Sequence, residues 1–398
     1  MQENTTSPDK IRVLALFGGV NMLGSERGNL EALTAIKEKG AQVLLVVSNA
    51  PWAEEIRRDV IARGFDIFQS PYLTLRRPDN PINPLLVYPP AIIRASRQLR
   101  KVIAEFKPTH IHASNQLHVM NFSPALVFSR LPLVYRCGDK PVQHNFVFRA
   151  IWRFIARRTS QFVVVSKFIS FKLQETGIPA EKISVIYSRP PKRISTSLQH
   201  DENGNAGVIR ILFVGQINVT KGPQILIDAF ERVAADFPQA KLVIAGRISD
   251  WEGDAWARDL RATTLANTSL AGRVSFPGFV EDVPGLMASC HLVVIPTLTE
   301  EPLANVVLES KQAGLASIIF PSGGLPETIE HAVDGFICRD NSIESLVDGL
   351  RFYLADPGKI IGHGQSARAS LAKFRISDFS ENWSKIYIQS FDSGTSSS

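Results

Sequence analysis

VIRILFVGQINVTKGPQILIDAF, residues 208–230, places an apolar run, a glycine turn and a helix-length amphipathic segment in direct succession. The apolar run is continuous rather than alternating, which is typical of a strand buried on both faces of a parallel sheet. A strand, a turn with glycine and a helix in this order predict the first unit of a doubly wound α/β domain.

The same alternation of apolar runs and helix-length segments extends through both halves of the chain. After residue 208 the further runs are AKLVIAGRI, VSFPGF, HLVVIPT and LASIIF, and before it they are IRVLALFGG, AQVLLVVS, GFDIFQ, THIHAS, PLVYRCG, QFVVVS and KISVIYS. We therefore predict an α/β protein of two Rossmann-like, doubly wound domains that face a cleft. Ligands of such domains bind beyond the carboxyl ends of the strands.

Two segments with prolines depart from this alternation. The polar stretch SRPPKRISTSLQHDENGNAG, residues 188–207, is typical of a connection between domains, so we predict a first domain over residues 1–195 and a second over residues 205–375. The stretch PYLTLRRPDNPINPLLVYPP, residues 71–90, contains six prolines and predicts a long irregular loop.

Length and composition favour a globular protein with two cores. The chain has 398 residues, of which 44% are hydrophobic and 21% are charged. No apolar run approaches the roughly 20 residues that cross a bilayer, and the first residues, MQENTTSPDK, lack a signal-peptide pattern. Cys137, Cys290 and Cys338 are too scattered for a disulfide framework or a zinc site. We expect a cytoplasmic protein with buried, reduced thiols.

Charge is divided unevenly between the two halves. Residues 1–200 hold 28 Lys and Arg against 14 Asp and Glu, a net +14, whereas residues 201–398 hold 16 against 24, a net −8. This asymmetry predicts different partners for the two halves. We expect an anionic partner, but not nucleic acid, beside the first half.

A pair of carboxylates follows the apolar run HLVVIPT. In EEPLANVVLESKQAG, residues 300–314, Pro302 suits the first turn of a helix, with Glu301 at its cap and Glu309 eight residues later. A helical rise of about 1.5 Å per residue separates the two by roughly 12 Å, comparable to a nucleotide-sugar between its hexose and its ribose. Backbone N–H groups at the helix start would hold the diphosphate, and they belong to Leu303, Ala304 and Asn305. The alternative interpretation is an acidic helix cap plus a solvated glutamate.

Two glycine turns lie at the same predicted edge. Lys221 follows the first strand of the second half and would bring an ammonium group there, although a lysine in such a turn is often only a surface residue. Gly18 and Gly19 end the first strand of the first half and would let a phosphate approach the backbone.

The stretch THIHASN carries two alternating histidines in the first half. His110 and His112 share one face of a predicted strand, where packing is the simpler explanation. Asn115 and His118 follow the end of that strand and are candidates for contacts with an acceptor.

Together these features resemble a known family. The segment PTLTEEPLANVVLESKQAGLASIIFPSGGLPETIEHAVDGFI, residues 296–337, is similar to the signature of the retaining glycosyltransferases of family 4, in which Glu-Pro-Phe-Gly, a later Glu and a Gly-Gly-x-x-Glu turn follow in order. Residues 165–188 resemble the end of the family's first domain, and FSENWSKIYIQSF, residues 379–391, resembles its last helix. The resemblance covers nearly the whole chain. It implies the GT-B fold, with a terminal helix over about residues 376–393 that crosses back to complete the first domain.

The resemblance also implies roles for individual residues in the second, donor-binding domain. Lys221 would bind the donor diphosphate, Glu309 the ribose and Glu301 the transferred sugar, while Gly323 and Gly324 would shape the turn nearby. The complete predicted donor-binding set is Gly19, Gly215, Gln216, Lys221, Arg247, Glu301, Leu303, Ala304, Asn305 and Glu309.

The chain departs from the family pattern at three points. Gln216 stands where the family usually has an arginine beside the diphosphate, and Arg247 is the available replacement cation. The Phe-Gly after Glu-Pro has become Leu-Ala. The histidine that often follows the fifth strand of the first domain has no counterpart in YRCGDKPVQHN, where Asp139 and His144 are the available polar groups. The predicted catalytic set is therefore Glu301, Lys221, Asp139 and His144.

The implied reaction is retaining transfer of a hexose from a nucleoside-diphosphate sugar. Retaining glycosidases place two carboxylates about 5 Å apart, which is too short for this glutamate pair, so the leaving diphosphate itself would take the acceptor proton. We expect a UDP-sugar, or else a GDP-sugar, as co-substrate, and neither a cofactor nor a metal. The alternatives are a GT-B epimerase or phosphorylase, and a nucleotide-sugar-binding protein that has lost catalysis.

Positive charge in the first half bears on the acceptor. NFVFRAIWRFIARR, residues 145–158, interleaves apolar residues with four arginines and would suit an anionic membrane surface. RASRQLRK, residues 94–101, adds to this charge, as do Arg76 and Arg77, which with Asn115 and His118 form the predicted acceptor side. We expect a saccharide or lipid-linked acceptor in polysaccharide or glycoconjugate synthesis, and peripheral attachment to the inner face of the cell membrane. The alternative is that the apolar residues pack on the sheet and the arginines are solvated.

Overall fold

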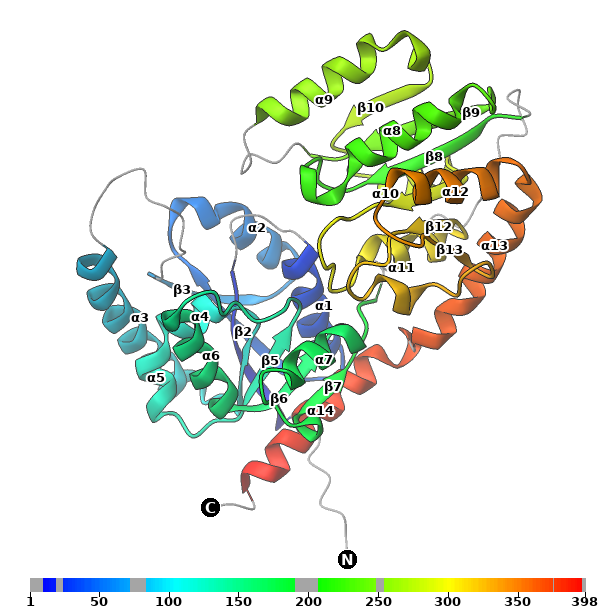
Figure 1. Ribbon diagram of the computed structural model, residues 1–398. Helices are drawn as coiled ribbons and strands as arrows, with labels where there is room; N and C mark the ends of the chain where they lie inside the picture. The colour runs from blue at the N-terminus through cyan, green and yellow to red at the C-terminus, as the bar shows by residue number, and fades with distance from the viewer. Residues whose placement is uncertain are drawn as a thin grey trace, which may run out of the picture. The chain divides into compact units, whose positions relative to one another are not determined.

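The computed structural model describes residues 10–18, 24–71, 84–189, 207–247, 254–374 and 376–395. The chain divides into unit 1, formed by Met1–Tyr187 with Ser377–Ser398, and unit 2, formed by Ser188–Ile376. Figure 1 shows that each unit is a parallel sheet with helices on its faces. The predicted fold class, two Rossmann-like doubly wound sheets, is confirmed.

Within the described residues, unit 1 contains a seven-stranded sheet in the order β3-β2-β1-β4-β5-β6-β7, in which all neighbouring strands are parallel. Its strands are β1 (Arg12–Leu16), β2 (Gln42–Ser48), β3 (Asp66–Ser70), β4 (His110–Ala113), β5 (Leu133–Cys137), β6 (Thr159–Val164) and β7 (Ile183–Val185). Its helices are α1 (Gly24–Glu38), α2 (Glu54–Ala62), α3 (Pro84–Phe106), α4 (Gln116–Asn121), α5 (Ser123–Phe128), α6 (Phe146–Arg158), α7 (Lys167–Gln174) and α14 (Phe379–Thr395).

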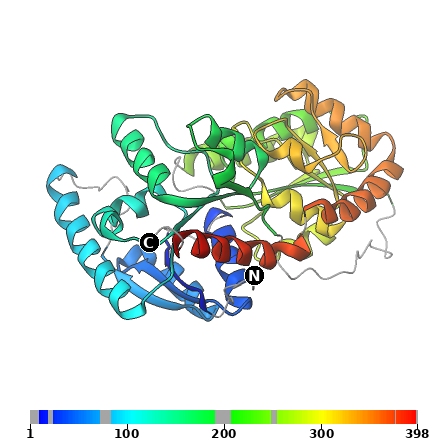
Figure 2. The same cartoon turned by 90° about the horizontal axis from the view of Figure 1, so that it is seen from below.

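The last helix of the chain is part of the core of unit 1. α14, red in Figures 1 and 2, packs on α1, and its Trp383 and Tyr387 are each 1% exposed within the same apolar cluster as β1 and β2. Tyr387 hydroxyl lies 2.5 Å from Nδ1 of His112 on β4, whose Nε2 lies 2.6 Å from Oδ1 of Asn29 on α1. This buried chain of hydrogen bonds joins α14, the sheet and α1, as expected of a terminal helix that completes the first domain.

Within the described residues, unit 2 contains a six-stranded parallel sheet in the order β10-β9-β8-β11-β12-β13. Its strands are β8 (Ile209–Val214), β9 (Ala240–Ala245), β10 (Val274–Gly278), β11 (Leu292–Ile295), β12 (Ala316–Ile319) and β13 (Gly335–Ile337). Its helices are α8 (Pro223–Ala234), α9 (Asp254–Ala266), α10 (Val283–Ala288), α11 (Asn305–Ala313), α12 (Ile343–Leu354) and α13 (Pro357–Ser370). Every residue of β11 and β12 is buried, which explains their uninterrupted apolar sequence.

Two local predictions were wrong. Residues 84–90 were expected in an irregular loop, but α3 begins at Pro84 and contains Pro89 and Pro90. Proline is compatible with the first helical position, whereas Pro89 and Pro90 are exposed inside the helix, where each removes one backbone donor. The rest of the proline-rich stretch, residues 72–83, lies outside the described residues. The strand β13 was missed. It begins at Gly335, and its apolar residues form a shorter run than those around β7, which also has three residues but was predicted.

Two sequence expectations concern cysteines and membrane spans. Cys137, Cys290 and Cys338 are free and buried, as predicted. Among the helices in the described part of the chain, none combines the length and the apolar character needed to cross a bilayer.

Candidate functional site

The strand order of unit 2 changes direction between β8 and β11. The chain runs from β8 to β9 and β10 on one side, then returns to place β11 on the other side of β8. Because all these strands are parallel, the turn after β8 and the loop after β11 meet at the carboxyl edge of the sheet. Open α/β sheets bind ligands at such a switch point.

Lys221 and Glu301 meet at this switch point. Lys221 ends a short turn after β8, Glu301 lies in the loop after β11, and the ammonium group of Lys221 forms an ion pair with the Glu301 carboxylate. The side chains are 32% and 15% exposed, so both charges reach the surface of unit 2. Both residues were predicted at this edge, and they are in direct contact there.

The turn that carries Lys221 is fixed by its neighbours. The side-chain oxygen of Asn218 accepts hydrogen bonds from the backbone N–H of Lys221 at 3.0 Å and from the hydroxyl of Thr220 at 2.9 Å. Gly222 has φ 72°, and a side chain there would collide with the Pro296 carbonyl at the end of β11. Only glycine fits this left-handed position, which holds the turn against β11. Asn218 was missed by the sequence reasoning, although an Asx residue three positions before the lysine is a recognisable cap.

Glu301 is positioned by a second glycine turn, after β12. Gly323 has φ 60°, and a side chain there would collide with the backbone of Glu301. The backbone N–H of Gly324 donates a hydrogen bond to the Glu301 carbonyl at 2.7 Å. The Gly-Gly pair therefore lets the two loops approach closely and fixes the backbone beneath the carboxylate.

Helix α11 begins later than the sequence predicted. It starts at Asn305, with Ala304 as its N-cap, whereas Pro302 was expected in the first turn and Glu301 at the cap. The intervening residues 301–304 are not helical, so the helical rise does not give the separation between Glu301 and Glu309. Ala304 has no side-chain acceptor. The N–H groups that the helix start leaves without helical partners belong to Ala304, Asn305 and Val306, while that of Val307 donates to the Ala304 carbonyl at 3.0 Å.

A buried ion pair lies beneath α11. Lys311 Nζ is 2.7 Å from the Asp334 carboxylate and 2.9 Å from Ser370 Oγ, and the side chains of the ion pair are 0% and 4% exposed. Asp334 also accepts the backbone N–H of Glu330 at 2.8 Å. Burial lowers the pKa of Lys311, while the hydrogen bond and charge of Asp334 oppose this. The pair joins α11 to the turn before β13 and to α13. The only indication of it in the sequence is a lysine on the apolar side of a helix.

The other predicted donor-binding residues of unit 2 are close in sequence to Lys221 or Glu301, or follow β9, and they differ in solvent exposure. Gly215 and Gln216 follow β8 and are half-buried, and Glu309 is half-buried on α11. Leu303 is 8% exposed and Ala304 is 9% exposed. Arg247 is exposed after β9, with its guanidinium carbon 4.7 Å from the ring centroid of Phe279. Its compensation for Gln216 stays a prediction.

Four predicted residues of unit 1 follow the carboxyl ends of β4 and β5 in its own sheet. Asn115 follows β4 and caps α4 by accepting the Leu117 N–H at 2.8 Å. His118 is 3% exposed, and burial lowers its pKa to about 4. Asp139 and His144 follow β5 and are exposed, and their catalytic roles stay predictions. Gly19, Arg76 and Arg77 lie outside the described residues.

Sequence reasoning missed a charged cluster at the same edge of unit 1. Arg136, on β5, is 5% exposed, and its guanidinium lies against Gly28 of α1, where a side chain would collide with it. Burial lowers the pKa of Arg136 to about 10, although the nearby Asp139, Cys137 and Glu26 raise it. Burial raises the pKa of Glu26. The position of Arg136 within a strand predicted to be buried could have indicated this cluster.

Metal-binding groups were not expected. Among the residues that the structure describes, no three His, Cys, Asp or Glu side chains gather as metal ligands. The expectation of a metal-free reaction stays a prediction.

Comparison with known proteins decides the family. The family model described as Glycosyltransferase Family 4 matches residues 23–188, and the model described as Glycosyl transferases group 1 matches residues 196–370. Together the two models span both units. The chain belongs to glycosyltransferase family 4.

Relatives of this family 4 chain include proteins from archaea and bacteria. An uncharacterized glycosyltransferase of Methanocaldococcus jannaschii is 30% identical over 264 residues, which cover 63% of this chain and 65% of that protein. Spore coat protein SA of Bacillus subtilis is 33% identical over 142 residues, which cover 35% of this chain and 37% of that protein. The chain thus spans less than two thirds of the length of these curated relatives.

A solved structure shares the architecture of the family 4 chain. The Anabaena protein HepE, crystallised with UDP and glucose, matches with a TM-score of 0.77 at 20% identity, covering 94% of this chain and 99% of that chain. The match shows that the family 4 chain has the GT-B fold.

Proposed function

We propose that the protein is a retaining glycosyltransferase that moves a hexose from a nucleoside-diphosphate sugar to a saccharide or lipid-linked saccharide. The observation that carries this proposal is the Lys221–Glu301 ion pair at the β8–β11 switch point, beside the start of α11. A cation, a carboxylate and unbonded helix N–H groups within one unit match the phosphates and hydroxyls of such a donor.

Donor binding would rearrange the ion pair. The diphosphate would take the place of the Glu301 carboxylate at Lys221 and would accept the N–H groups of Asn305 and Val306. Glu301 would then be free to accept hydrogen bonds from the hydroxyls of the sugar, and Glu309 would accept those of the ribose. This exchange keeps Lys221 charge-balanced with and without donor, which explains why a half-buried lysine lies opposite a carboxylate in the free protein.

Transfer would then proceed on one face of the sugar. The bond between the anomeric carbon and the diphosphate oxygen breaks, the acceptor oxygen bonds to that carbon, and the acceptor proton passes to the leaving diphosphate. Lys221 and the α11 N–H groups would stabilise the charge that develops on the diphosphate. Asp139 and His144 are the proposed polar groups near the acceptor in unit 1.

A UDP-sugar is the proposed donor, with a GDP-sugar as the alternative. HepE of Anabaena was solved with UDP and glucose, and this supports the choice of base without identifying the sugar. No cofactor is proposed.

The acceptor side is proposed to attach to an anionic membrane on the cytoplasmic side. On α6, Trp152 and Ile155 are buried, whereas Phe146 is 77% exposed and Val147 is 43% exposed beside solvent-facing arginines. Exposed apolar and basic residues on one helix support a surface that contacts lipid headgroups. Arg158, at the end of the same helix, instead bonds to backbone carbonyls of unit 1.

The substitution at Gln216 favours a second candidate, a nucleotide-sugar-binding protein without transfer. A glutamine cannot supply the second cation expected beside the diphosphate. Turnover of any donor by the purified protein would reject this candidate.

A screen of nucleotides by thermal stabilisation tests the donor proposal. A ligand that binds only the folded state raises the melting temperature, so UDP or GDP should do so, and ADP, which carries the same diphosphate on another base, serves as the control. In titrations of the diphosphate, Glu309→Ala should weaken binding, whereas Glu301→Ala should bind it at least as tightly, because no carboxylate then competes for Lys221, and should lose turnover. Equal and unchanged affinity in both variants would contradict the assignment of the two glutamates.

A further inference from the structure

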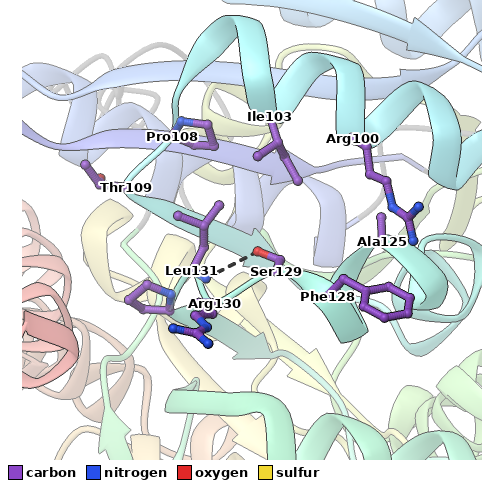
Figure 3. Close-up of a pocket in the computed structure, with 10 residues that line it drawn as sticks. Arg100, Ile103, Pro108, Thr109, Ala125, Phe128, Ser129, Arg130 and Leu131 are labelled. Atoms are coloured by element: carbon purple, nitrogen blue, oxygen red, sulfur yellow. Dashed lines mark hydrogen bonds between the residues drawn. The ribbon is translucent and has the colours of Figure 1, made fainter. Parts of the chain in front are cut away.

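A pocket of about 570 Å³ lies in unit 1, and none of the predicted catalytic, donor-binding or acceptor-side residues that the structure describes lines it. Figure 3 shows it between α3, α5 and the segments that precede β4 and β5. It is lined by Arg100, Ile103, Pro108, Thr109, Ala125, Phe128, Ser129, Arg130, Leu131 and Pro132. Because these segments enter the amino ends of parallel strands, the pocket opens at the edge of the sheet opposite to Asn115 and Asp139.

The lining combines apolar walls with positive charge. Six of the ten lining residues are apolar, two are arginines, and no carboxylate is among the described residues that line the pocket. The two hydroxyl groups are used within the protein: Thr109 Oγ1 donates to the Arg12 carbonyl at 3.1 Å, and Ser129 Oγ accepts the Leu131 N–H at 3.2 Å. The volume is within the roughly 300–1,000 Å³ of small-molecule sites.

One end of the pocket carries an exposed aromatic ring beneath a cation. Phe128 is 76% exposed, and the guanidinium carbon of Arg100 lies 5.0 Å from its ring centroid. Arg100 also donates to the Pro124 carbonyl at 3.1 Å, so its position is fixed. Figure 3 shows Arg100 and Phe128 at this end, with Pro108 and Thr109 at the other. A phenyl ring this exposed is unfavourable in water and would be covered by an apolar ligand.

The loop that forms the floor is held rigidly from behind. Arg158, on α6, donates to the carbonyls of Ser129 and Leu131 at 2.6 Å each and to that of Leu126 at 3.1 Å. Burial lowers the pKa of Arg158. A floor fixed by three hydrogen bonds loses little freedom when a ligand binds, which favours affinity.

We propose that this pocket binds a single-chain carboxylate amphiphile of the fatty-acid class. Its carboxylate would meet Arg100 at the Phe128 end, and its hydrocarbon chain would contact Phe128, Ile103 and Leu131. Arg130, which also lines the pocket, would add positive charge at the rim. Charge complementarity selects an anion over a neutral lipid, and the exposed Arg94 and Arg97 on the preceding turns of α3 would raise the local concentration of anions. The site is independent of the proposed donor site, which lies in unit 2.

Calorimetric titration of the full chain with octanoate, decanoate and dodecanoate below their micelle concentrations tests the proposal. Affinity should rise roughly fourfold with each added methylene until the pocket is full. Dodecanol, which has the same chain and no charge, should bind at least about tenfold more weakly, as expected for a lost charge-assisted hydrogen bond. The double variant Arg100→Gln/Arg130→Gln should lose the same factor for dodecanoate.

Two further variants make the result specific. Arg153→Gln removes an exposed arginine of α6 that does not line the pocket and should leave dodecanoate binding unchanged. Ile103→Trp should fill the pocket and abolish binding while the melting temperature stays near that of the wild type. Equal affinity of dodecanol and dodecanoate, or equal loss in the Arg153 variant and the double variant, would overturn the proposal. Binding to phosphatidylglycerol vesicles without binding to monomeric dodecanoate would overturn it in favour of a membrane contact.

Discussion

Replacement of Lys311 by methionine should destabilise unit 2 strongly. Lys311 and Asp334 form an ion pair at 2.7 Å with side chains 0% and 4% exposed, so the change leaves a carboxylate buried without its cation. Breaking such a pair from one side costs about 3–5 kcal/mol. For a unit of this size, each kcal/mol lowers the melting temperature by roughly 2–4 °C, which gives a decrease of about 6–20 °C.

The exposed pair Arg351–Asp236 in the same unit provides the control. Its atoms are 2.6 Å apart, but the side chains are 47% and 52% exposed, so Arg351→Ala should cost at most about 1 kcal/mol. The double variant Lys311→Met/Asp334→Asn should regain more than half of the loss, because asparagine keeps an acceptor for the Glu330 N–H without a buried charge. Calorimetry gives the transitions, and hydrogen exchange in peptides of α11 assigns the loss to unit 2. A Lys311→Met variant no less stable than Arg351→Ala would refute the reasoning.

Three further predictions follow from single sites. Burial lowers the pKa of His112 to about 3, while an unfolded histidine titrates near 6.5. As the pH falls through 6.5, only the unfolded state gains this proton, so the His112 contribution to the free energy of unfolding decreases by about 2 kcal/mol from pH 7 to pH 5. Urea unfolding of His112→Asn should therefore lose about 2 kcal/mol less over this pH range than the wild type does. Gly323→Ala should weaken UDP binding and stability more than Gly177→Ala, because both glycines have positive φ (60° and 86°) but only the first has backbone atoms in the way; equal melting temperatures would contradict this. Lys221→Ala should lower kcat about 10²- to 10³-fold, more than Gln216→Ala does, and Gln216→Arg should tighten UDP binding in titrations unless another cation already lies there.

The sheets were predictable because their strands are buried on both faces. A short, continuous apolar run such as HLVVIPT indicates a buried strand, and β11 lies within this run. The start of α11 was not predictable by the same reasoning. Glu-Pro has the local preferences of a helix start, but Gly324 donates to the Glu301 carbonyl and the Gly323 turn packs on the Glu301 backbone, so residues 301–304 stay outside the helix. Contacts between loops that follow different strands leave no periodic signal in the sequence.

The site was predictable in its residue types and only partly in its contacts. Lys221 and Glu301 were placed at one edge because each follows a strand of the same parallel sheet. Their direct ion pair depends on the strand order, since β11 returns to lie beside β8 rather than beside β10. The buried Lys311–Asp334 pair and the Arg136 cluster depend on tertiary packing of charged residues, and local patterns treat such residues as surface.

The place of α14 in the core of unit 1 sets an order for folding during synthesis. Trp383 and Tyr387 fill the apolar cluster beside β1 and β2, yet they leave the ribosome only after all of unit 2 has been made. Unit 2, whose residues are contiguous, is able to finish folding first, while the apolar cluster between α1, α2 and the sheet of unit 1 still lacks the side chains of α14. A nascent chain stalled before Phe379 therefore presents an apolar surface of the kind that chaperones bind.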